Sequence, residues 1–428
     1  MTHATIRSGI PWHDDRGSVV NAHGACVVEE GGRYYLFGEY KADEGNAFGG
    51  FACYSSLDLV NWTFERMALP VQPEGLLGPD RIGERPKVMK CPSTGQFVMY
   101  MHADDLRYMD PHIGVATSAT IDGEFIFRGP LLHGDEPLRR WDMGTFQDRD
   151  GTGYVLVHDG DIYRLSTDYL TIDAQVATGI AEGGESPAML EHEGQYFIIF
   201  SNKTMWERND NYYLSAPSPA GPWVHRGLLA PEGTLTHNSQ CTFVLRIQRG
   251  DESTYMYMGD RWSFPRQASS ASYVWLPLTV GGSGISLPAF LPEWSLEGSA
   301  PVEPEPAQVD VQFAARLPGA SVEIPFSGGR AAVHGDTNSQ SGYARLEVHE
   351  RVSGRLAHAG YVDFYSLVES TGLRYLSPAL PAGDYTLRLT VTGEMPVSYN
   401  KAGTRFGATD SFVTVTGVSC DVAPELGD

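Results

Sequence analysis

Three carboxylates stand at similar places in a repeating pattern of polar segments and apolar strands. Glu84, Asp142 and Glu185 each lie shortly before a strand rich in aromatic residues. Glu84 and Glu185 are both followed by X-Pro, and proline stiffens the backbone and keeps the residue before it extended. Carboxyl groups at fixed positions can share acid–base catalysis, one protonated and one ionised. The pattern therefore predicts a site to which distant parts of the chain contribute.

The strands that must position these groups recur five times. They are residues 32–37, 95–100, 153–157, 194–199 and 254–258. A spacing of roughly 40 to 60 residues suits one four-stranded blade per repeat, and no run of apolar residues at helical spacing competes with it. We predict an all-β fold with a five-bladed β-propeller. The inner strands of a propeller converge on its axis, so one residue from each blade can meet the others there.

A second domain follows a segment in which Pro and Glu alternate. Residues 299–307 form a stiff, extended spacer that cannot join a sheet interior. Beyond it, alternating apolar and polar residues predict a β-sandwich of about a hundred residues. The predicted domains are a catalytic propeller over 1–298, a linker over 299–307 and an accessory sandwich over 308–428. Two segments near its end, Gly383-Asp384-Tyr385-Thr386-Leu387 and Asp410-Ser411-Phe412-Val413-Thr414-Val415, resemble the closing strands of galactose-binding-like jelly rolls.

Composition limits the partners. A formal net charge of −22 disfavours nucleic acid and anionic membranes, because phosphate groups bind to basic surfaces. No apolar run approaches the roughly twenty residues of a membrane span, and residues 1–7 lack the apolar centre of a signal peptide. We expect a cytoplasmic protein, or a secreted one if a leader was trimmed. The sequence does not indicate an oligomeric state.

Cysteine usage indicates neither a disulfide framework nor a zinc site. The five cysteines are odd in number and form no CxxC pair. Most lie in strand-like runs, where cysteine acts as a small core residue. We predict no metal and no cofactor, although the sequence leaves open a structural cation on the propeller axis.

The recurring carboxylates point to glycoside hydrolysis. That reaction uses two carboxyl groups on either side of the scissile bond, one protonated and one ionised. A single Asp or Glu is usually a solvated surface group. Recurrence at one position of successive blades favours a shared site, and a neutral carbohydrate suits the acidic composition.

Eight segments in order along the chain are similar to the signature set of glycoside hydrolase family 43. Within that family they resemble the branch of exo-β-1,3-galactanases, and the resemblance spans residues 8 to 295. The segments are Gly9-Ile10-Pro11-Trp12, Ala22-His23-Gly24, Tyr35-Leu36-Phe37-Gly38-Glu39, Glu84-Arg85-Pro86-Lys87-Val88, Asp142-Met143 with Phe146-Gln147-Asp148, Glu185-Ser186-Pro187-Ala188-Met189, Ser239-Gln240-Cys241-Thr242-Phe243 and Met258-Gly259-Asp260-Arg261-Trp262.

This resemblance implies an inverting mechanism with assigned roles. Glu185 takes the position of the general acid, and Asp142 that of the carboxylate that orients the acid and raises its pKa. Most of the family has an aspartate base in the first blade, where this chain has Asn21 and His23. In the galactanase branch, Glu84 and Gln240 are the positions that face the attacking water. Either Glu84 takes the proton, or Gln240 positions the water through its imidic tautomer, since an ordinary amide is a poor proton acceptor.

Further residues near these motifs are predicted to bind the sugar. Flat aromatic rings stack on the C–H face of galactose, and polar neighbours bind its hydroxyl groups. The predicted rings are Trp12, Tyr40, Trp141, Trp206 and Trp262. The predicted polar contacts are His23, Glu39, Asn202, Asp260 and Arg261.

The predicted function is release of galactose from β-1,3-linked galactan or galacto-oligosaccharides by an inverting exo-glycoside hydrolase. Two alternatives stay open: a family 43 glycosidase for another non-reducing sugar such as arabinose, xylose or fucose, and a non-catalytic sugar-binding propeller. The sandwich either binds sugar at a rim through Tyr361, Asp363 and Tyr365 or only buttresses the propeller.

Overall fold

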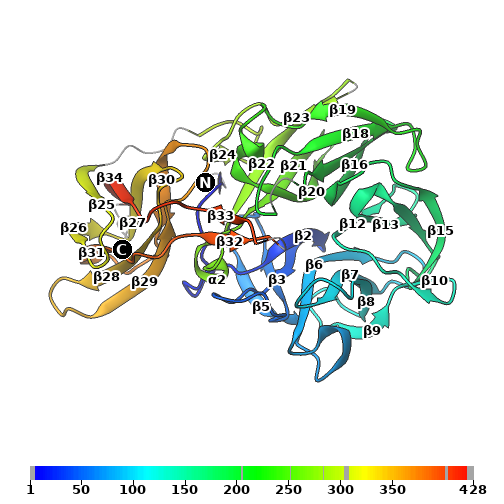
Figure 1. Ribbon diagram of the computed structural model, residues 1–428, viewed down its shortest axis with the longest axis horizontal. Helices are drawn as coiled ribbons and strands as arrows, with labels where there is room; N and C mark the ends of the chain where they lie inside the picture. Colours follow the sequence, from blue (N-terminus) through cyan, green and yellow to red (C-terminus); the bar gives the residue numbers. More distant parts are fainter. Residues whose placement is uncertain are drawn as a thin grey trace. The chain divides into compact units, whose positions relative to one another are not determined.

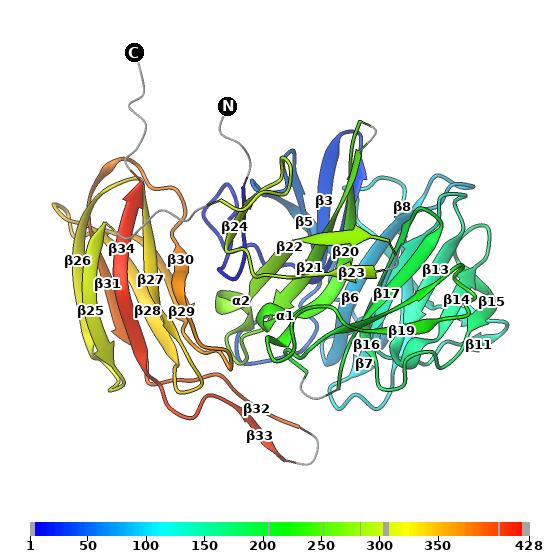
Figure 2. The ribbon, with the colours of Figure 1, turned by 90° about the horizontal axis from the view of Figure 1, so that it is seen from above.

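The computed structural model describes residues 5–203, 206–250, 252–282, 284–302, 308–400 and 403–421 (Figures 1 and 2). Almost all of its regular structure is β, which confirms the predicted all-β class. The chain forms two compact units. The first comprises mainly Asn21–Arg261 and Tyr273–Pro301, and the second comprises Arg7–Val20, Trp262–Ser272 and the described residues from Val302 onward.

The predicted domain limits stay a prediction. The division into units assigns two segments of the predicted propeller, Arg7–Val20 and Trp262–Ser272, to the second unit. Residues 303–307 of the predicted linker lie outside the described residues.

The first unit contains five sheets in which strands that follow one another in sequence pair antiparallel, as far as the chain is described. The first two sheets are β2 (His23–Glu30), β3 (Arg33–Glu39), β4 (Phe51–Ser56) and β5 (Thr63–Leu69), and β6 (Arg81–Lys90), β7 (Phe97–Asp105), β8 (His112–Ser118) and β9 (Ile126–Pro130). The third is β12 (Met143–Gln147), β13 (Gly153–Val157), β14 (Ile162–Leu165) and β15 (Thr171–Ala177), with β10 (Leu132–His133) and β11 (Glu136–Pro137) at its edge. The last two are β16 (Glu185–His192), β17 (Gln195–Ser201), β18 (Tyr212–Ala216) and β19 (Val224–Leu228), and β20 (Gln240–Arg249), β21 (Glu252–Arg261), β22 (Ser272–Gly281) and β23 (Gly284–Ser286). A small separate sheet pairs β1 (Thr5–Arg7) with β24 (Glu293–Ser295).

The first strands of these five sheets form a closed ring. β2 contacts β6, β6 contacts β12, β12 contacts β16, β16 contacts β20, and β20 returns to β2. In Figure 1 these strands lie around a common centre, with β9, β15 and β19 outermost. Separate apolar cores fill the spaces between consecutive sheets, for example Phe37 with Met99 and Tyr100 with Val155. The all-β architecture fits a β-propeller.

Short helical turns connect these strands: η1 (Gly75–Leu77), η2 (His158–Gly160), α1 (Leu235–Asn238) and α2 (Gln267–Ser270). In the described residues, no helix is long and apolar enough to cross a membrane. All five cysteines are buried with free thiols, and Cys26, Cys53 and Cys241 lie in the apolar cores, as predicted for small core residues.

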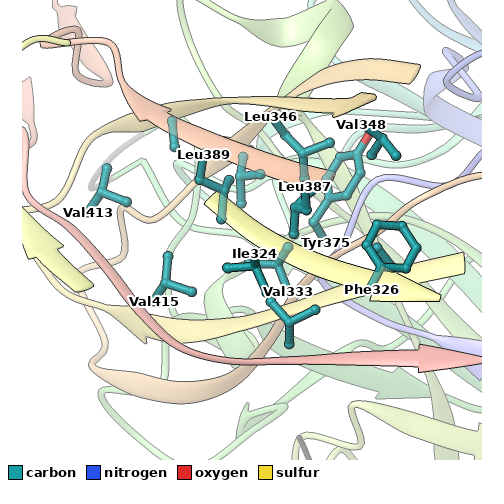
Figure 3. Packing of buried hydrophobic residues seen from close by; sticks show 14 of the residues in the cluster. Ile324, Phe326, Val333, Leu346, Val348, Tyr375, Leu387, Leu389, Val413 and Val415 are labelled. Atoms are coloured by element: carbon teal, nitrogen blue, oxygen red, sulfur yellow. The ribbon is translucent and has the colours of Figure 1, made fainter. Parts of the chain in front are cut away.

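The second unit contains two four-stranded sheets. One has the order β25 (Val309–Ala315), β34 (Val413–Asp421), β27 (Arg330–Thr337) and β30 (Ser370–Leu376), and the other β26 (Ser321–Gly328), β31 (Gly383–Val391), β28 (Tyr343–Glu350) and β29 (Leu356–Asp363). Both sheets supply side chains to one apolar core (Figure 3), which fits a β-sandwich. The hairpin of β32 (Val397–Tyr399) and β33 (Arg405–Gly407) projects beyond the two sheets in Figure 2.

Contacts inside the second unit already occupy the residues considered for sugar binding at its rim. The Arg266 guanidinium lies 3.8 Å from the centre of the Tyr361 ring. The Ser263 hydroxyl donates to Asp363 Oδ2 at 2.8 Å, and Tyr365 is buried. These three side chains therefore do not form an open platform.

Candidate active site

Four of the predicted polar residues occupy matching places at the start of a first strand. His23, Glu185 and Gln240 are the first residues of β2, β16 and β20, and Glu84 is the fourth residue of β6. The register of each strand shifts just after this position, as at a β-bulge. Bulges re-aim side chains, and they recur next to active sites. Asp142 directly precedes β12, the remaining first strand.

A second set of polar residues lies opposite the first on the neighbouring strands. His23 pairs with Glu39, Glu84 with His102, Glu185 with Ser201, and Gln240 with Asp260. Glu39 and Asp260 were predicted from sequence, but His102 and Ser201 were not. The signal for His102 was available, because two polar residues, His102 and Asp104, interrupt an otherwise apolar strand.

Arg85 connects the groups that the sequence predicted to meet. Its backbone N–H donates to Glu39 Oε1 at 2.9 Å, its Nε donates to Asp142 Oδ1 at 2.9 Å, and its terminal nitrogen donates to Gln240 Oε1 at 2.8 Å. The side chain is buried, and its backbone adopts a left-handed φ of 52°. The surrounding carboxylates outweigh its burial and raise its pKa. Sequence reasoning did not identify this guanidinium as part of the site.

Glu185 lies where a carboxyl group stays protonated at neutral pH. Burial raises the pKa of Glu185 to about 8, and the negative charge of Asp142 adds to this, while Lys203 and Arg85 oppose it. Asp142 Oδ2 also accepts hydrogen bonds from the Ser186 backbone N–H at 3.1 Å and the Ser186 hydroxyl at 3.3 Å. Asp142 therefore anchors the residue next to Glu185 and disfavours ionisation of the Glu185 carboxyl.

The surroundings of Glu84 favour its ionised form. Its Oε1 accepts from the Tyr108 hydroxyl at 2.7 Å and from Asn46 Nδ2 at 3.2 Å, and its Oε2 lies 3.2 Å from His102 Nδ1. Burial alone raises the pKa of Glu84, but the hydrogen bond from His102 and the charge of Lys41 outweigh burial and hold it well below its ordinary value. Two carboxyl groups with pKa values pushed apart can act as an acid and an ionised acceptor.

Glu39 forms a buried pair beside Glu84. Lys41 Nζ lies 2.5 Å from Glu39 Oε2 and 3.9 Å from Glu84 Oε1. Burial raises the pKa of Glu39 against the opposing charge of Lys41. Gly24 packs so closely that an added Cβ would stand 2.1 Å from Glu39 Oε1. This part of the site therefore requires a glycine.

The predicted residues of the first and fifth sheets are buried against each other. His23 Nδ1 lies 3.1 Å from Asp260 Oδ1, and the His23 ring stacks on Tyr273 at 4.8 Å. The Gly24 N–H donates to Asp260 Oδ2 at 3.0 Å. His23 and Asp260 are 0% and 1% exposed, so neither side chain is accessible to solvent. Their contact with sugar stays a prediction.

The predicted aromatic rings divide between the two units. In the first unit Tyr40, Trp141 and Trp206 are exposed, which a stacking platform requires. Trp12 and Trp262 belong to the second unit, and Trp262 is buried. Local sequence motifs could not show this division, because it depends on the path of the chain between the units.

The remaining predicted polar contacts bind backbone carbonyls. Asn202 Nδ2 donates to the Asp210 carbonyl at 2.6 Å. Arg261 donates to the carbonyls of Asn238 at 3.1 Å and His237 at 3.0 Å. These bonds secure the backbone around the site, and the contact of Asn202 and Arg261 with sugar stays a prediction.

A strained turn leads into Gln240. The four residues of α1 (Leu235–Asn238) all have left-handed φ values between 51° and 61°, which non-glycine residues rarely adopt. Asp210 Oδ1 accepts from the Leu235 N–H at 2.8 Å, and Arg261 binds the far end of the turn. Such strain persists only where the surroundings enforce it, and it clusters at active sites. The turn fixes the start of β20 and thus the position of Gln240.

Within the described part of the chain, one group of side chains has the spacing of metal ligands. Ligand atoms of Glu84, His102 and Asp142 lie within 4.8 Å of one another. However, Arg85 binds Asp142, and Lys41 lies 3.9 Å from Glu84. These cations already neutralise the carboxylates, so the residues fit an internally balanced cluster better than a metal centre.

No family model matches the sequence, and no curated protein matches it. Solved structures do match. A putative exo-β-1,3-galactanase from Bifidobacterium bifidum is 37% identical, with a TM-score of 0.62, over 65% of this chain and 95% of that chain. The exo-β-1,3-galactanase from Phanerochaete chrysosporium, solved with galactose, is 26% identical, with a TM-score of 0.71, over 97% of this chain and 99% of that chain. A GH43 β-1,3-galactosidase solved with galactodeoxynojirimycin is 26% identical, with a TM-score of 0.61, over 66% of this chain and 98% of that chain.

The site pairs a carboxyl group with a raised pKa, Glu185, and one with a lowered pKa, Glu84. Together with the ring of sheets and these similarities, this pair defines a glycoside hydrolase. The predicted enzyme class is thereby confirmed. The chain belongs to glycoside hydrolase family 43, as the resemblance of its eight segments indicated.

Proposed function

We propose that this protein is an inverting exo-glycosidase that releases galactose from the non-reducing end of β-1,3-linked galactan or galacto-oligosaccharides. The opposite ionisation of Glu185 and Glu84 carries the proposal, because inverting hydrolysis needs a protonated and an ionised group. The related fungal enzyme supports the choice of sugar, since it was solved with galactose and, as a variant, with β-1,3-galactotriose.

Each group at the centre has a role in this proposal. Glu185 donates its proton to the leaving glycosidic oxygen as the C–O bond breaks. Asp142 holds the backbone beside Glu185 and keeps the acid protonated. A water held by Glu84 and Gln240 attacks the anomeric carbon from the opposite face of the ring. This geometry gives an α-product from a β-linkage.

The water must also lose a proton. Arg85 donates to Gln240 Oε1 at 2.8 Å, and the carbonyl oxygen of the ordinary amide accepts from a cation better than a hydroxyl oxygen does. The imidic tautomer would place a hydrogen on that oxygen. The hydrogen bond thus favours Glu84 as the group that receives the proton, with Gln240 orienting the water.

The architecture is part of the same proposal. We propose that the ring of five sheets is a five-bladed β-propeller and that the second unit is an accessory sandwich of the jelly-roll type. In this proposal, the catalytic groups come from the inner strands and the exposed rings of Tyr40, Trp141 and Trp206 receive the sugar. The reaction uses no metal or cofactor.

A substrate panel tests this function. The full chain is incubated with β-1,3-, β-1,4- and β-1,6-linked galactobioses and with aryl arabinosides, xylosides and fucosides, and released monosaccharides are identified. We expect galactose from the β-1,3-linked substrate only, and much slower release from that substrate with Glu185→Gln. Release of another sugar would support a different family 43 glycosidase. Tight binding of β-1,3-galactobiose without cleavage would support the non-catalytic alternative.

A further inference from the structure

A buried histidine lies between two carboxylates, one of which is Glu84. His102 Nδ1 is 3.2 Å from Glu84 Oε2, and His102 Nε2 is 3.1 Å from Asp104 Oδ2. The three residues come from the paired strands β6 and β7, where Glu84 is directly opposite His102. His102 is 1% exposed and Asp104 is 0% exposed, so water cannot replace either partner.

Both carboxylates also accept hydrogen bonds from other donors. Asp104 Oδ1 accepts from the backbone N–H groups of Asp105 at 2.8 Å and Asp110 at 2.7 Å. Glu84 Oε1 accepts from the hydroxyl of Tyr108 and has Lys41 Nζ at 3.9 Å. These contacts, together with His102, favour the ionised form of Glu84.

The protonation of His102 follows from its two partners. A neutral imidazole has one N–H donor and one lone pair, and that lone pair would face an oxygen of Glu84 or Asp104. An imidazolium donates from both nitrogens and satisfies both carboxylates. The hydrogen bonds that His102 donates to Asp104 and Glu84 outweigh burial, and the pKa of His102 rises to about 9. The negative charge of Asp142 acts in the same direction.

We propose that His102 is a positioning residue that acts, as an imidazolium held by Asp104, by fixing the Glu84 carboxylate as an ionised acceptor for the attacking water. The inference rests on the proposed function for the role of Glu84. The Glu84–His102–Asp104 chain itself follows from contacts within one sheet, so the charge state of His102 can be tested without any substrate.

The first measurement is a pH titration by NMR of the full chain labelled with ¹⁵N-histidine. The chain has 13 histidines, and the variant His102→Gln identifies the His102 signal by its absence. We expect both ring nitrogens of His102 to stay protonated through pH 8. In Asp104→Asn the second carboxylate is lost, and the pKa of His102 should fall toward its ordinary value of 6.5.

Asp110→Asn is the matched control. Asp110 lies in the loop that follows β7, and its carboxyl accepts from Arg81 and Arg139 rather than from His102. The titration of His102 should not change in this variant. A His102 that is neutral at pH 7 in the wild type, or that titrates equally in Asp104→Asn and wild type, overturns the inferred charge state whether or not the protein cleaves galactobiose.

The second measurement connects the charge to turnover. In Asp104→Asn, His102 should be charged at pH 5.5 and largely neutral at pH 7.5, so kcat relative to wild type should fall between these values. Division by the wild-type rate cancels the titration of Glu185. His102→Gln can still donate to Glu84 but carries no charge, and we expect its kcat to fall roughly tenfold to a hundredfold, with a smaller change in KM. Unfolding curves confirm that each variant is folded.

A structural role alone predicts a different result. The Asp104→Asn ratio would then be the same at both pH values, as we expect for Asp110→Asn. A flat ratio, or wild-type kcat in folded His102→Gln, would overturn the positioning role even if NMR showed the imidazolium. Absence of activity in the wild type would instead count against the proposed function, and the NMR titration would still decide the charge state.

Discussion

Glu84 and Glu185 occupy matching positions on two first strands, yet their ionisation is shifted in opposite directions. Each is followed by a residue with left-handed φ, then by proline, and each lies just before a register shift. The difference comes from their partners. Glu84 has three hydrogen-bond donors and a nearby lysine, whereas Glu185 is buried near the negative charge of Asp142.

Removal of the acid should abolish turnover with little effect on binding. We expect Glu185→Gln to lower kcat on β-1,3-galactobiose by roughly 10²- to 10⁴-fold, the usual contribution of general acid catalysis. The amide has nearly the same shape, so the dissociation constant for galactose should change little. Glu193→Gln, at an exposed turn after the same strand, is the control and should keep wild-type kcat. Equal rates for the two variants would remove Glu185 from the mechanism.

Activity should decline in alkali with the ionisation of Glu185. Because Glu185 must be protonated, kcat should be constant below its pKa and fall as pH rises through about 8. Asp142→Asn removes the negative charge beside Glu185, so the alkaline limb should move to lower pH by about one unit or more. Asp159 is a weaker cause of the same shift, and Asp159→Asn should move the limb less. If the alkaline limb of the pH–kcat profile does not move in Asp142→Asn, the charge of Asp142 does not raise the pKa of Glu185.

The resemblance of motifs to family 43 allowed the family and the enzyme class to be predicted, and strand periodicity gave the all-β class. The contacts that set the pKa values of the site residues were harder to predict from the sequence. Arg85 reaches Asp142 and Gln240 only because its backbone is left-handed at a bulge. His102 meets Glu84 through the pairing register of β6 and β7. Bulges and register depend on tertiary packing, which residue types in one sequence do not encode locally.

Gly24 should tolerate a side chain less well than a glycine of the same conformation. Gly24 and Gly31 have φ values of 59° and 61°, but an added Cβ meets nothing within 4 Å at Gly31. Gly31→Ala should cost about 1–2 kcal/mol of unfolding free energy from backbone strain. Gly24→Ala should cost about 1–3 kcal/mol more, because its methyl group overlaps Glu39. Urea unfolding measures both, and equal costs would refute the close packing at Glu39.

Two histidines should make the protein sensitive to acid. Tyr375 Oη lies 3.1 Å from His13 Nε2 and 2.7 Å from His358 Nε2 in the second unit. Burial lowers the pKa of His13 to about 3, and His358 and Arg330 add to this shift. Burial lowers the pKa of His358 to about 4. The folded protein therefore has its full stability from the two neutral histidines above pH 6.5. This contribution to the free energy of unfolding is lost as pH falls from 6.5 toward the two lowered pKa values.

Thermal unfolding at pH 7 and pH 5 measures this effect. The decrease in Tm between the two pH values should be smaller in His358→Gln than in wild type. His133→Gln, at an exposed position, should leave the decrease unchanged. An identical pH dependence in wild type and His358→Gln would show that His358 does not titrate on unfolding.

The anomeric form of the first product most directly tests whether Glu185 and Glu84 act as an inverting pair. ¹H NMR of the full chain with the methyl β-glycoside of β-1,3-galactobiose, whose leaving group keeps a blocked anomeric carbon, resolves α- and β-galactose before they interconvert. Attack by a water held at Glu84 and Gln240 should give α-galactose first. Initial β-galactose would indicate a covalent intermediate at a second carboxylate and would contradict inversion.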